Sequence, residues 1–152
     1  MRKNCFIKLS GDTLDMDILD WIRELSGEYF LVICVGGGTQ INEAFKKAGL
    51  PEGKFGPLGR ETASLEERQL ARDILEKNQA YVQDRLSDMN VNASVVIPVL
   101  DIGTVLCHIN GDQFVLTAYH GFDVLYVVTT KERVEKKRLL FSPYEKIQVI
   151  GF

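Results

Sequence analysis

A run of three glycines is the stretch of this sequence best suited to chemistry. Gly36, Gly37 and Gly38 follow the apolar segment "YFLVICV" (29–35) and precede residues with helical periodicity. A turn without Cβ atoms lets backbone N–H groups approach a ligand, and the helix N-terminus behind it favours a phosphate or carboxylate. The alternative is a tight turn that only packs the helix closely. Neither a GxGxxG nor a Walker pattern fits, so a dinucleotide site is disfavoured.

A second turn places a cation beside a bare backbone. In "IKLSGDT", Lys8 lies near the end of an apolar run, and Ser10 and Gly11 occupy the turn that follows. This turn is expected at the same sheet edge as the three glycines, where ligands of open α/β sheets bind. A lysine ammonium there suits an oligophosphate or a phosphoryl group in transit. The alternative for Lys8 is a strand-edge lysine with its head in water.

The segment "HINGDQF" supplies a third group of candidates. Asn110, Gly111 and Asp112 follow an apolar run and open a predicted helix. A helix cap is one explanation for Asp112. If Asp112 instead faces Lys8, it would orient that ammonium.

Periodicity predicts alternating strands and helices. Helices are expected over 13–25 and from about 41 to 48, and Ser64 with Glu67 forms a capping box that opens a long helix ending near Leu86. A short helix is expected over 112–120. The interval 49–62, rich in glycine and proline, is predicted to be a loop. The expected strands are 5–9, 29–35, 93–99, 104–109 and 123–129.

Several of these apolar runs lack alternation of polar and apolar residues. Such runs are typical of strands that are covered on both faces. The sequence therefore predicts an α/β protein, a three-layer α/β/α sandwich with a mostly parallel central sheet.

Length and charge predict one domain, residues 1–152, without nucleic acid as a partner. The 152 residues, 45% of them hydrophobic, can bury one sizeable core. A net charge of −3 gives no broad basic surface. The tail, 131–152, is expected to form a solvated charged turn, "KERVEKKR", and then an edge strand, "KIQVI". A bare apolar edge favours pairing with another chain, so a homo-oligomer, most simply a homodimer, is expected.

The cysteines and the absence of long apolar runs favour a cytoplasmic protein. Cys5, Cys34 and Cys107 lie in strand-like runs without CxxC spacing, which favours buried structural thiols over metal ligands or disulfides. No apolar run of about 18 residues occurs, so no membrane span is predicted. No cationic leader followed by an apolar stretch occurs either, so no secretion signal is predicted.

These pieces, in this order, resemble the amino acid kinase family, which contains acetylglutamate, aspartate and carbamate kinases and bacterial uridylate kinase. "IKLSG" is similar to the family's first strand with its K-x-x-G turn, and "VICVGGGTQINEAF" to its second glycine turn and helix. "LGRETASLEERQLARDIL" is similar to an acetylglutamate kinase stretch in which an arginine precedes a threonine and a long helix. "HINGDQFVLTAYHGFDVLYVVTT" resembles the N-x-D helix and the strand after it. The resemblance covers nearly the whole chain.

The resemblance implies phosphoryl transfer from ATP, with Mg²⁺, to a small carboxylate, carbamate or phosphate acceptor. Lys8 would stabilise the transferred phosphoryl group and Asp112 would hold Lys8 in place. Ser10, Gly11 and the glycines 36–38 would bind phosphate groups, and Gly37 and Gly38 also the acceptor. Arg60 would bind an acceptor carboxylate through its bidentate fork, and Asn110 would contact the acceptor or the nucleotide. The alternative for Arg60 is a loop arginine in solvent.

Departures from the family pattern leave three functions open. Family members usually continue into a lobe that binds the nucleotide, and this sequence, ending at Phe152, is expected to lack most of that lobe. Thr130 stands where the family has an aspartate, and His108 where acetylglutamate kinases have an asparagine. The chain is then a minimal phosphotransferase, a non-catalytic or regulatory module that binds a small anionic metabolite, or a purely structural subunit.

Overall fold

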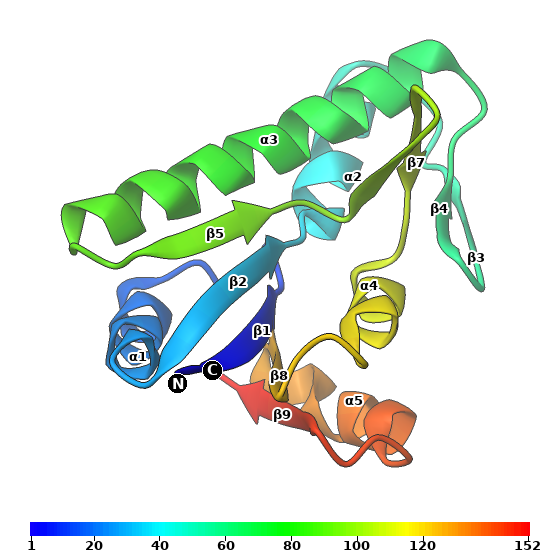
Figure 1. Ribbon diagram of the computed structural model, residues 1–152. Coiled ribbons are helices and arrows are strands. Elements are labelled where there is room, and N and C mark those ends of the chain that lie inside the picture. The colour runs from blue at the N-terminus through cyan, green and yellow to red at the C-terminus, as the bar shows by residue number, and fades with distance from the viewer.

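The computed structural model describes residues 1–152 and has a single five-stranded parallel sheet at its centre (Figure 1). The strand order is β5-β2-β1-β8-β9, and each neighbouring pair is parallel. The predicted α/β/α sandwich is confirmed, with a central sheet that is parallel throughout. The strands are β1 (Lys3–Leu9), β2 (Tyr29–Val35), β5 (Ala93–Val96), β8 (Val124–Thr129) and β9 (Ile147–Gly151).

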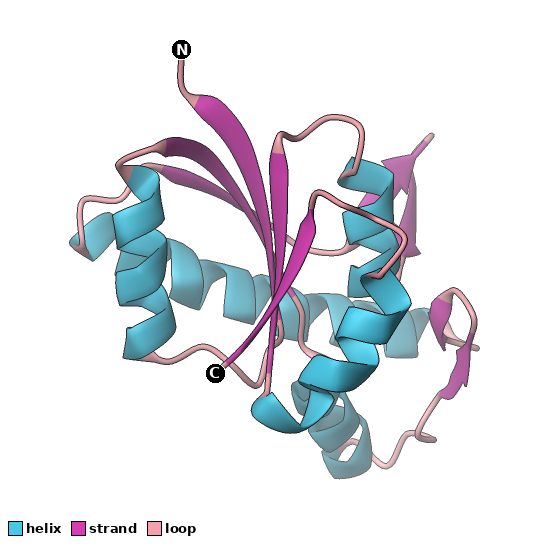
Figure 2. Cartoon of the chain, turned by 90° about the horizontal axis from the view of Figure 1, so that it is seen from below, coloured by secondary structure: helices cyan, strands magenta, loops and turns pink.

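Helices cover both faces of this sheet (Figure 2). The largest core cluster joins α1 and α3 to one face, and a second cluster joins α4 and α5 to the other. A third cluster packs α2 against α3. The helices are α1 (Met16–Ser26), α2 (Gly38–Lys47), α3 (Leu65–Asp88), α4 (Gly111–Ala118) and α5 (Val134–Phe141), with a 3₁₀ turn, η1 (Lys131–Arg133), before α5.

Alternation along β1 decides which face of the sheet receives Lys8. Cys5, Ile7 and Leu9 belong to the cluster on the α1 face, whereas Phe6 belongs to the cluster on the α4 face. Because successive side chains point to opposite faces of a strand, Lys8 lies on the same face as Phe6. Its register partners are Cys34 of β2 and Val127 of β8. The sequence therefore directs this cation under α4.

Two hairpins outside the sheet correct the predicted boundaries. The interval 49–62 is not a plain loop, since β3 (Lys54–Gly56) pairs with β4 (Gly59–Glu61). Pro57 and Leu58 form the turn between these strands, and Gly59, the first residue of β4, has a φ of 116°, which glycine adopts readily. The predicted strands 93–99 and 104–109 are also wrong in part. The first leaves the sheet before Pro98, which has no N–H to donate, and β6 (Val99–Ile102) then pairs only with β7 (Val105–His108).

The tail corrects a second prediction. Residues 131–141 form η1 and α5, not a solvated turn, because Val134 and Phe141 are two helical turns apart and both are buried. The predicted edge strand is confirmed as β9, which pairs only with β8. All three cysteines are free, Cys5 and Cys34 buried and Cys107 half-buried. None of the helices is both long and apolar enough to cross a membrane.

Candidate functional site

A cavity of about 330 Å³ lies at the carboxyl ends of the central strands. The connections from β1 and β8 leave in opposite directions along the sheet, toward β2 and β9. Such a reversal is the topological switch point where open α/β sheets bind ligands. Of the predicted site residues, all but Asp112 line this cavity: Lys8, Ser10 and Gly11 from the β1 turn, 36–38 from the β2 turn, and Arg60 and Asn110 from the hairpin and α4 side.

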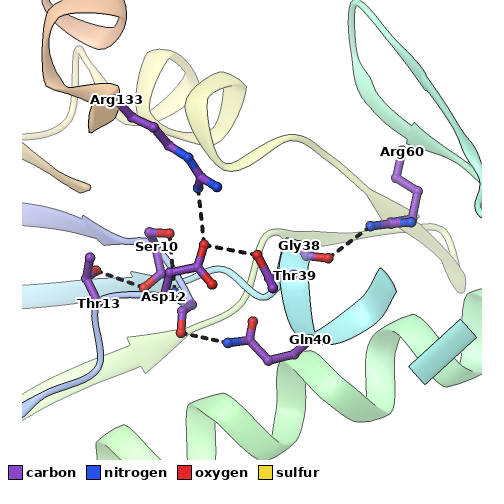
Figure 3. A network of polar contacts seen from close by, with 9 residues as sticks. Ser10, Asp12, Thr13, Gly38, Thr39, Gln40, Arg60 and Arg133 are labelled. Carbon is purple, nitrogen blue, oxygen red and sulfur yellow. Dashed lines mark hydrogen bonds and ion pairs between the residues drawn. The ribbon is translucent and has the colours of Figure 1, made fainter. Parts of the chain in front are cut away.

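The two glycine turns contact each other directly. A Cβ on Gly11 would lie 2.8 Å from the Gly36 carbonyl oxygen and 2.9 Å from the Gly37 Cα, so only glycine fits there. The amide of Gln40 donates to the Gly11 carbonyl at 2.8 Å (Figure 3). Asn78 of α3 donates to the Gly36 carbonyl at 3.0 Å. Close packing therefore explains part of the glycine pattern.

Packing does not explain the rest of that pattern. The N–H groups of Gly11 and Gly37 donate to no other backbone group, and a Cβ on Gly38 would meet nothing within 4 Å. Helix α2 begins after Gly37 without a side-chain cap and without an acidic residue in its first turn. These donors and the positive end of the helix dipole are therefore available to an anion in the cavity.

Ser10 is buried and serves the turn itself. Its N–H donates to the Val128 carbonyl at 3.1 Å, and its carbonyl accepts from the Thr13 hydroxyl at 2.9 Å (Figure 3). Its own hydroxyl accepts from the Asp12 N–H at 3.4 Å. The structure thus gives Ser10 a clear role in holding the β1 turn against β8.

The Lys8 side chain lies on the α4 face of the sheet, beneath the first residue of α4. A Cβ on Gly111 would lie 2.7 Å from the Lys8 Cε, so the lysine stem requires a glycine above it. The ammonium lines the cavity and makes no ion pair within 4.0 Å. Burial lowers the pKa of Lys8, and the nearby Asp112 carboxylate opposes that shift most strongly. The protein therefore places a half-buried cation at the cavity without a direct carboxylate partner.

Asp112 lies behind the cavity and not in its lining. The helix cap is Asn110, whose side-chain oxygen accepts from the Asp112 N–H at 2.9 Å. The Asp112 carboxylate forms an ion pair with Lys137 of α5, and its Oδ1 is buried without a hydrogen-bond partner. Asp112 acts on Lys8 through its charge, while its direct contact is to a lysine that sequence reasoning missed.

Arg60 of β4 reaches the cavity from the opposite side and is half-buried. One Nη donates to the Asn42 side-chain oxygen at 2.6 Å. The same Nη donates to the Gly38 carbonyl at 3.3 Å (Figure 3). The guanidinium lies over the rings of Phe45, at 5.3 Å, and Phe55, at 4.6 Å. Its other Nη is buried without a partner, and burial lowers the pKa of Arg60. The interpretation as a loop arginine in solvent is wrong.

The β3–β4 hairpin is fastened to the segment that opens α4. The Asn110 N–H donates to the Leu58 carbonyl at 3.1 Å. A Cβ on Gly59 would lie 2.9 Å from the Asn110 nitrogen. This contact closes the side of the cavity that carries Arg60, so the hairpin missed in the sequence is part of the site.

His108 and Cys34 adjoin the same cations. His108 lines the cavity and also a second one, of about 520 Å³, beside Arg68 and Arg72 of α3. Burial and then the charges of Arg60, Arg68 and Arg72 lower the pKa of His108. Burial raises the pKa of Cys34 to about 12. Cys34 is therefore a neutral packing residue beside Lys8.

Two charged lining residues were missed in the sequence. Asp12, in the β1 turn, accepts from the Thr39 hydroxyl at 3.0 Å and from Arg133 of η1 at 3.2 Å (Figure 3). Arg133 belongs to the run that was predicted to be a solvated turn, so its only sequence signal was its charge. The cavity thus has Lys8, Arg60 and Arg133 as cations against the single carboxylate of Asp12.

The fold and this cavity define a class: a parallel α/β/α sandwich with a cation-rich, glycine-lined cavity at its switch point. No protein-family model matches the chain, and no curated protein matches it at a significant level.

Proposed function

We propose that the cavity binds a small anionic metabolite and that the protein transfers a phosphoryl group from ATP to its carboxylate or phosphate. The observation that supports this proposal most is the pair Lys8 and Arg60. Both cations are half-buried, line one cavity and have no carboxylate within ion-pair distance. A desolvated cation without a counterion is costly, and a bound anion removes that cost.

The glycine turns favour a phosphate as one part of the ligand. Free backbone N–H groups and the uncapped end of α2 line the same cavity as Lys8. Phosphoryl transfer is catalysed mostly by positioning and by neutralising charge on the moving group, and a lysine with backbone donors supplies both. Lys8 would therefore hold the transferred group, and Arg60 would hold the acceptor.

The size of the cavity limits what it can contain. Small-molecule pockets usually measure about 300 to 1,000 Å³, and this one, at about 330 Å³, suits one small metabolite with its phosphoryl group. The adenosine part of ATP would lie outside it.

The cations and the single carboxylate that line the cavity fit ATP with Mg²⁺ in part. ATP would supply the phosphoryl group, and Mg²⁺ is usually held by one or two carboxylates together with substrate phosphates. No three histidine, cysteine or acidic side chains gather into a metal site. Asp12 is the carboxylate in the cavity lining that could face such an ion.

The second candidate is a non-catalytic or regulatory module that binds the same small anion. The observation that favours it is again the cavity volume, because the space matches the acceptor and one phosphate alone. Under this alternative the cations and glycine turns keep their binding roles, and no nucleotide is needed.

Calorimetry separates the candidates. N-acetylglutamate, aspartate and UMP are titrated with and without ATP and Mg²⁺, and ADP release is followed in parallel. N-acetylglutamine, which lacks one carboxylate, is the matched control for N-acetylglutamate. Anion binding with ADP release supports the phosphotransferase, and anion binding alone supports the module. Failure of every anion, including inorganic phosphate, to bind would leave only a structural role.

We also propose that the protein is cytoplasmic and forms a homo-oligomer. Three free thiols fit a reducing compartment. Strand β9 is an edge strand with one unpaired side, which fits pairing with a second copy of the chain. Sedimentation of the purified protein would test the second point.

A further inference from the structure

We propose that Asp12 occupies the place of the ligand's anion in the free protein, and that an arriving phosphate takes Arg133 from it. Arg133 is then the exchangeable cation of the site. The inference rests on the proposed anion binding and deepens it, because it names a third cation and the internal group that competes for it.

The ion pair between Asp12 and Arg133 lies across the cavity. Asp12 follows β1 and Arg133 follows β8, which are adjacent strands on either side of the switch point. Their side chains meet at 3.2 Å although 121 residues separate them in the sequence. Both line the cavity, and Figure 3 shows Arg133 reaching toward the β1 turn. The pair therefore spans the crevice in which ligands of such folds bind.

The two hydrogen-bond donors to Asp12 are groups of the kind that also bind phosphate. One carboxylate oxygen accepts from the Arg133 guanidinium and from the Thr39 hydroxyl in the first turn of α2 (Figure 3). A guanidinium and the donors of a helix N-terminus are the groups that bind phosphate in many proteins. Asp12 thus uses two donors that a phosphate oxygen would use.

The ion pair between Asp12 and Arg133 is weak because both side chains are partly exposed to solvent. The side chains are 52% (Arg133) and 24% (Asp12) exposed. Ion pairs exposed to this degree contribute little to stability, whereas a bidentate arginine–phosphate contact is stronger and geometrically specific. Exchange of Asp12 for a phosphate is therefore favourable for Arg133. The Arg133 charge also helps to lower the pKa of Lys8, so the two cations act on the same region.

Helix α5 holds Arg133 in position. Lys137 lies one helical turn after Arg133, and its half-buried ion pair with Asp112 ties α5 to the start of α4. Buried contacts of Val134 and Phe141 fix the same helix on the sheet. Arg133, the last residue of η1, can therefore change partner by a side-chain movement, without movement of α5.

A double-mutant cycle tests the exchange, with inorganic phosphate as the probe in calorimetry. Arg133→Gln should weaken phosphate binding about 10-fold, which is the low end for a charged hydrogen bond because the Arg133 side chain is half-exposed. Asp12→Asn keeps an oxygen for Thr39 and should tighten binding about 3- to 10-fold by removing the competitor. In the Arg133→Gln background most of that tightening should disappear. Arg138→Gln removes an exposed cation from the neighbouring helix α5 and should leave the affinity unchanged.

The cycle separates this inference from the proposed function. If wild-type protein binds no phosphate, anion binding fails and the exchange fails with it. If phosphate binds but Asp12→Asn does not tighten it, or tightens it equally without Arg133, the exchange is overturned while anion binding stands. Circular dichroism confirms the folding of each variant. A nitrogen-15 spectrum gives a second readout, in which the Arg133 guanidinium signal should shift on phosphate addition.

Discussion

The N-terminus of α3 is capped by a side chain of its own, whereas the N-terminus of α2 has no side-chain cap. At α3, the Ser64 hydroxyl accepts from the Glu67 N–H at 3.1 Å, and the Glu67 carboxylate accepts from the Ala63 N–H at 2.7 Å. This is the capping box predicted from the sequence. Glu66 and Glu67 also place negative charge in the first turn, which complements the helix dipole. The start of α3 needs no ligand.

The start of α2 lacks each of these features. Gly37 has no side chain with which to cap, and no acidic residue lies in the first turn. The two helices pack against each other through one apolar cluster, so they share an environment in the fold. They differ in that α2 begins at the cavity and α3 does not. This fold therefore closes the start of α3 with a side-chain cap of its own. At the start of α2, which lines the same cavity as Lys8, the backbone N–H groups stay uncapped, and the Asp12 carboxylate reaches only the Thr39 hydroxyl.

The largest expected effect is that of Lys8→Met, which removes the cation beside the open helix end. Phosphate affinity should fall about 30-fold or more, since a charged hydrogen bond is worth about 2 kcal/mol. Burial lowers the pKa of Lys8, so at any pH below its ordinary value of 10.5 the folded state disfavours the charge. The variant should therefore melt at a higher temperature. Calorimetry and thermal unfolding measure the two effects.

Lys46→Met is the matched control, because Lys46 is an exposed lysine in the last turn of α2. It should change neither quantity much. An unchanged phosphate affinity in Lys8→Met would remove Lys8 from the site and leave the open helix end without its cation.

A smaller effect is expected when α2 is made to resemble α3. In Gly38→Asp the new side chain has room, since a Cβ there meets nothing within 4 Å. The carboxylate should weaken phosphate binding about 10-fold by competing for the same donors, and should stabilise the helix by about 0.3 to 1 kcal/mol. Ser64→Ala makes the converse change at α3 and should cost about 1 kcal/mol of stability without altering affinity. Equal effects of the two variants on phosphate binding would contradict the comparison.

The sequence predicts the parts of the fold that depend on local pattern. Apolar runs between glycine turns predict the parallel sheet, and Ser64 with Glu67 predicts the start of α3. The tail was misread because "KERVEKKR" has mixed charge, while only Val134 and Phe141 form the stripe that buries α5. Two apolar residues in two turns are a weak signal against so many charges.

The same distinction between local pattern and tertiary packing applies to the site. Strand alternation and glycine turns were enough to place Lys8 and Gly37 at one edge. The contacts of Asp12 and Asp112 with cations from the tail depend on which face of the sheet α5 covers. That choice is made by tertiary packing, which no local pattern in this sequence encodes.

The smallest expected effect concerns His108, which lies on the cation-rich wall of the cavity. Burial first, and then Arg60, Arg68 and Arg72, lower the pKa of His108 below its ordinary value of 6.5. Below pH 6.5 the unfolded chain therefore binds a proton that the folded protein rejects, so stability is full above that pH and falls as the pH drops. Urea unfolding between about pH 8 and pH 5 should show this slope, and His108→Asn should flatten it.

Phosphate bound in the cavity should raise the lowered pKa of His108 in the wild type. This change would show that the anion lies near both His108 and the start of α2. An anion between the cations adds negative charge near the imidazole and raises its pKa, so binding should take up part of a proton below pH 6.5, in excess of the proton exchange of phosphate itself that His108→Asn also shows. Calorimetry in buffers of different ionisation enthalpy measures that uptake. His120→Asn, which removes the chain's other histidine, should keep this excess uptake, and His108→Asn should lose it. Equal uptake in the wild type and in His108→Asn would place the anion away from this wall and weaken the case that the open end of α2 and Arg60 serve one ligand.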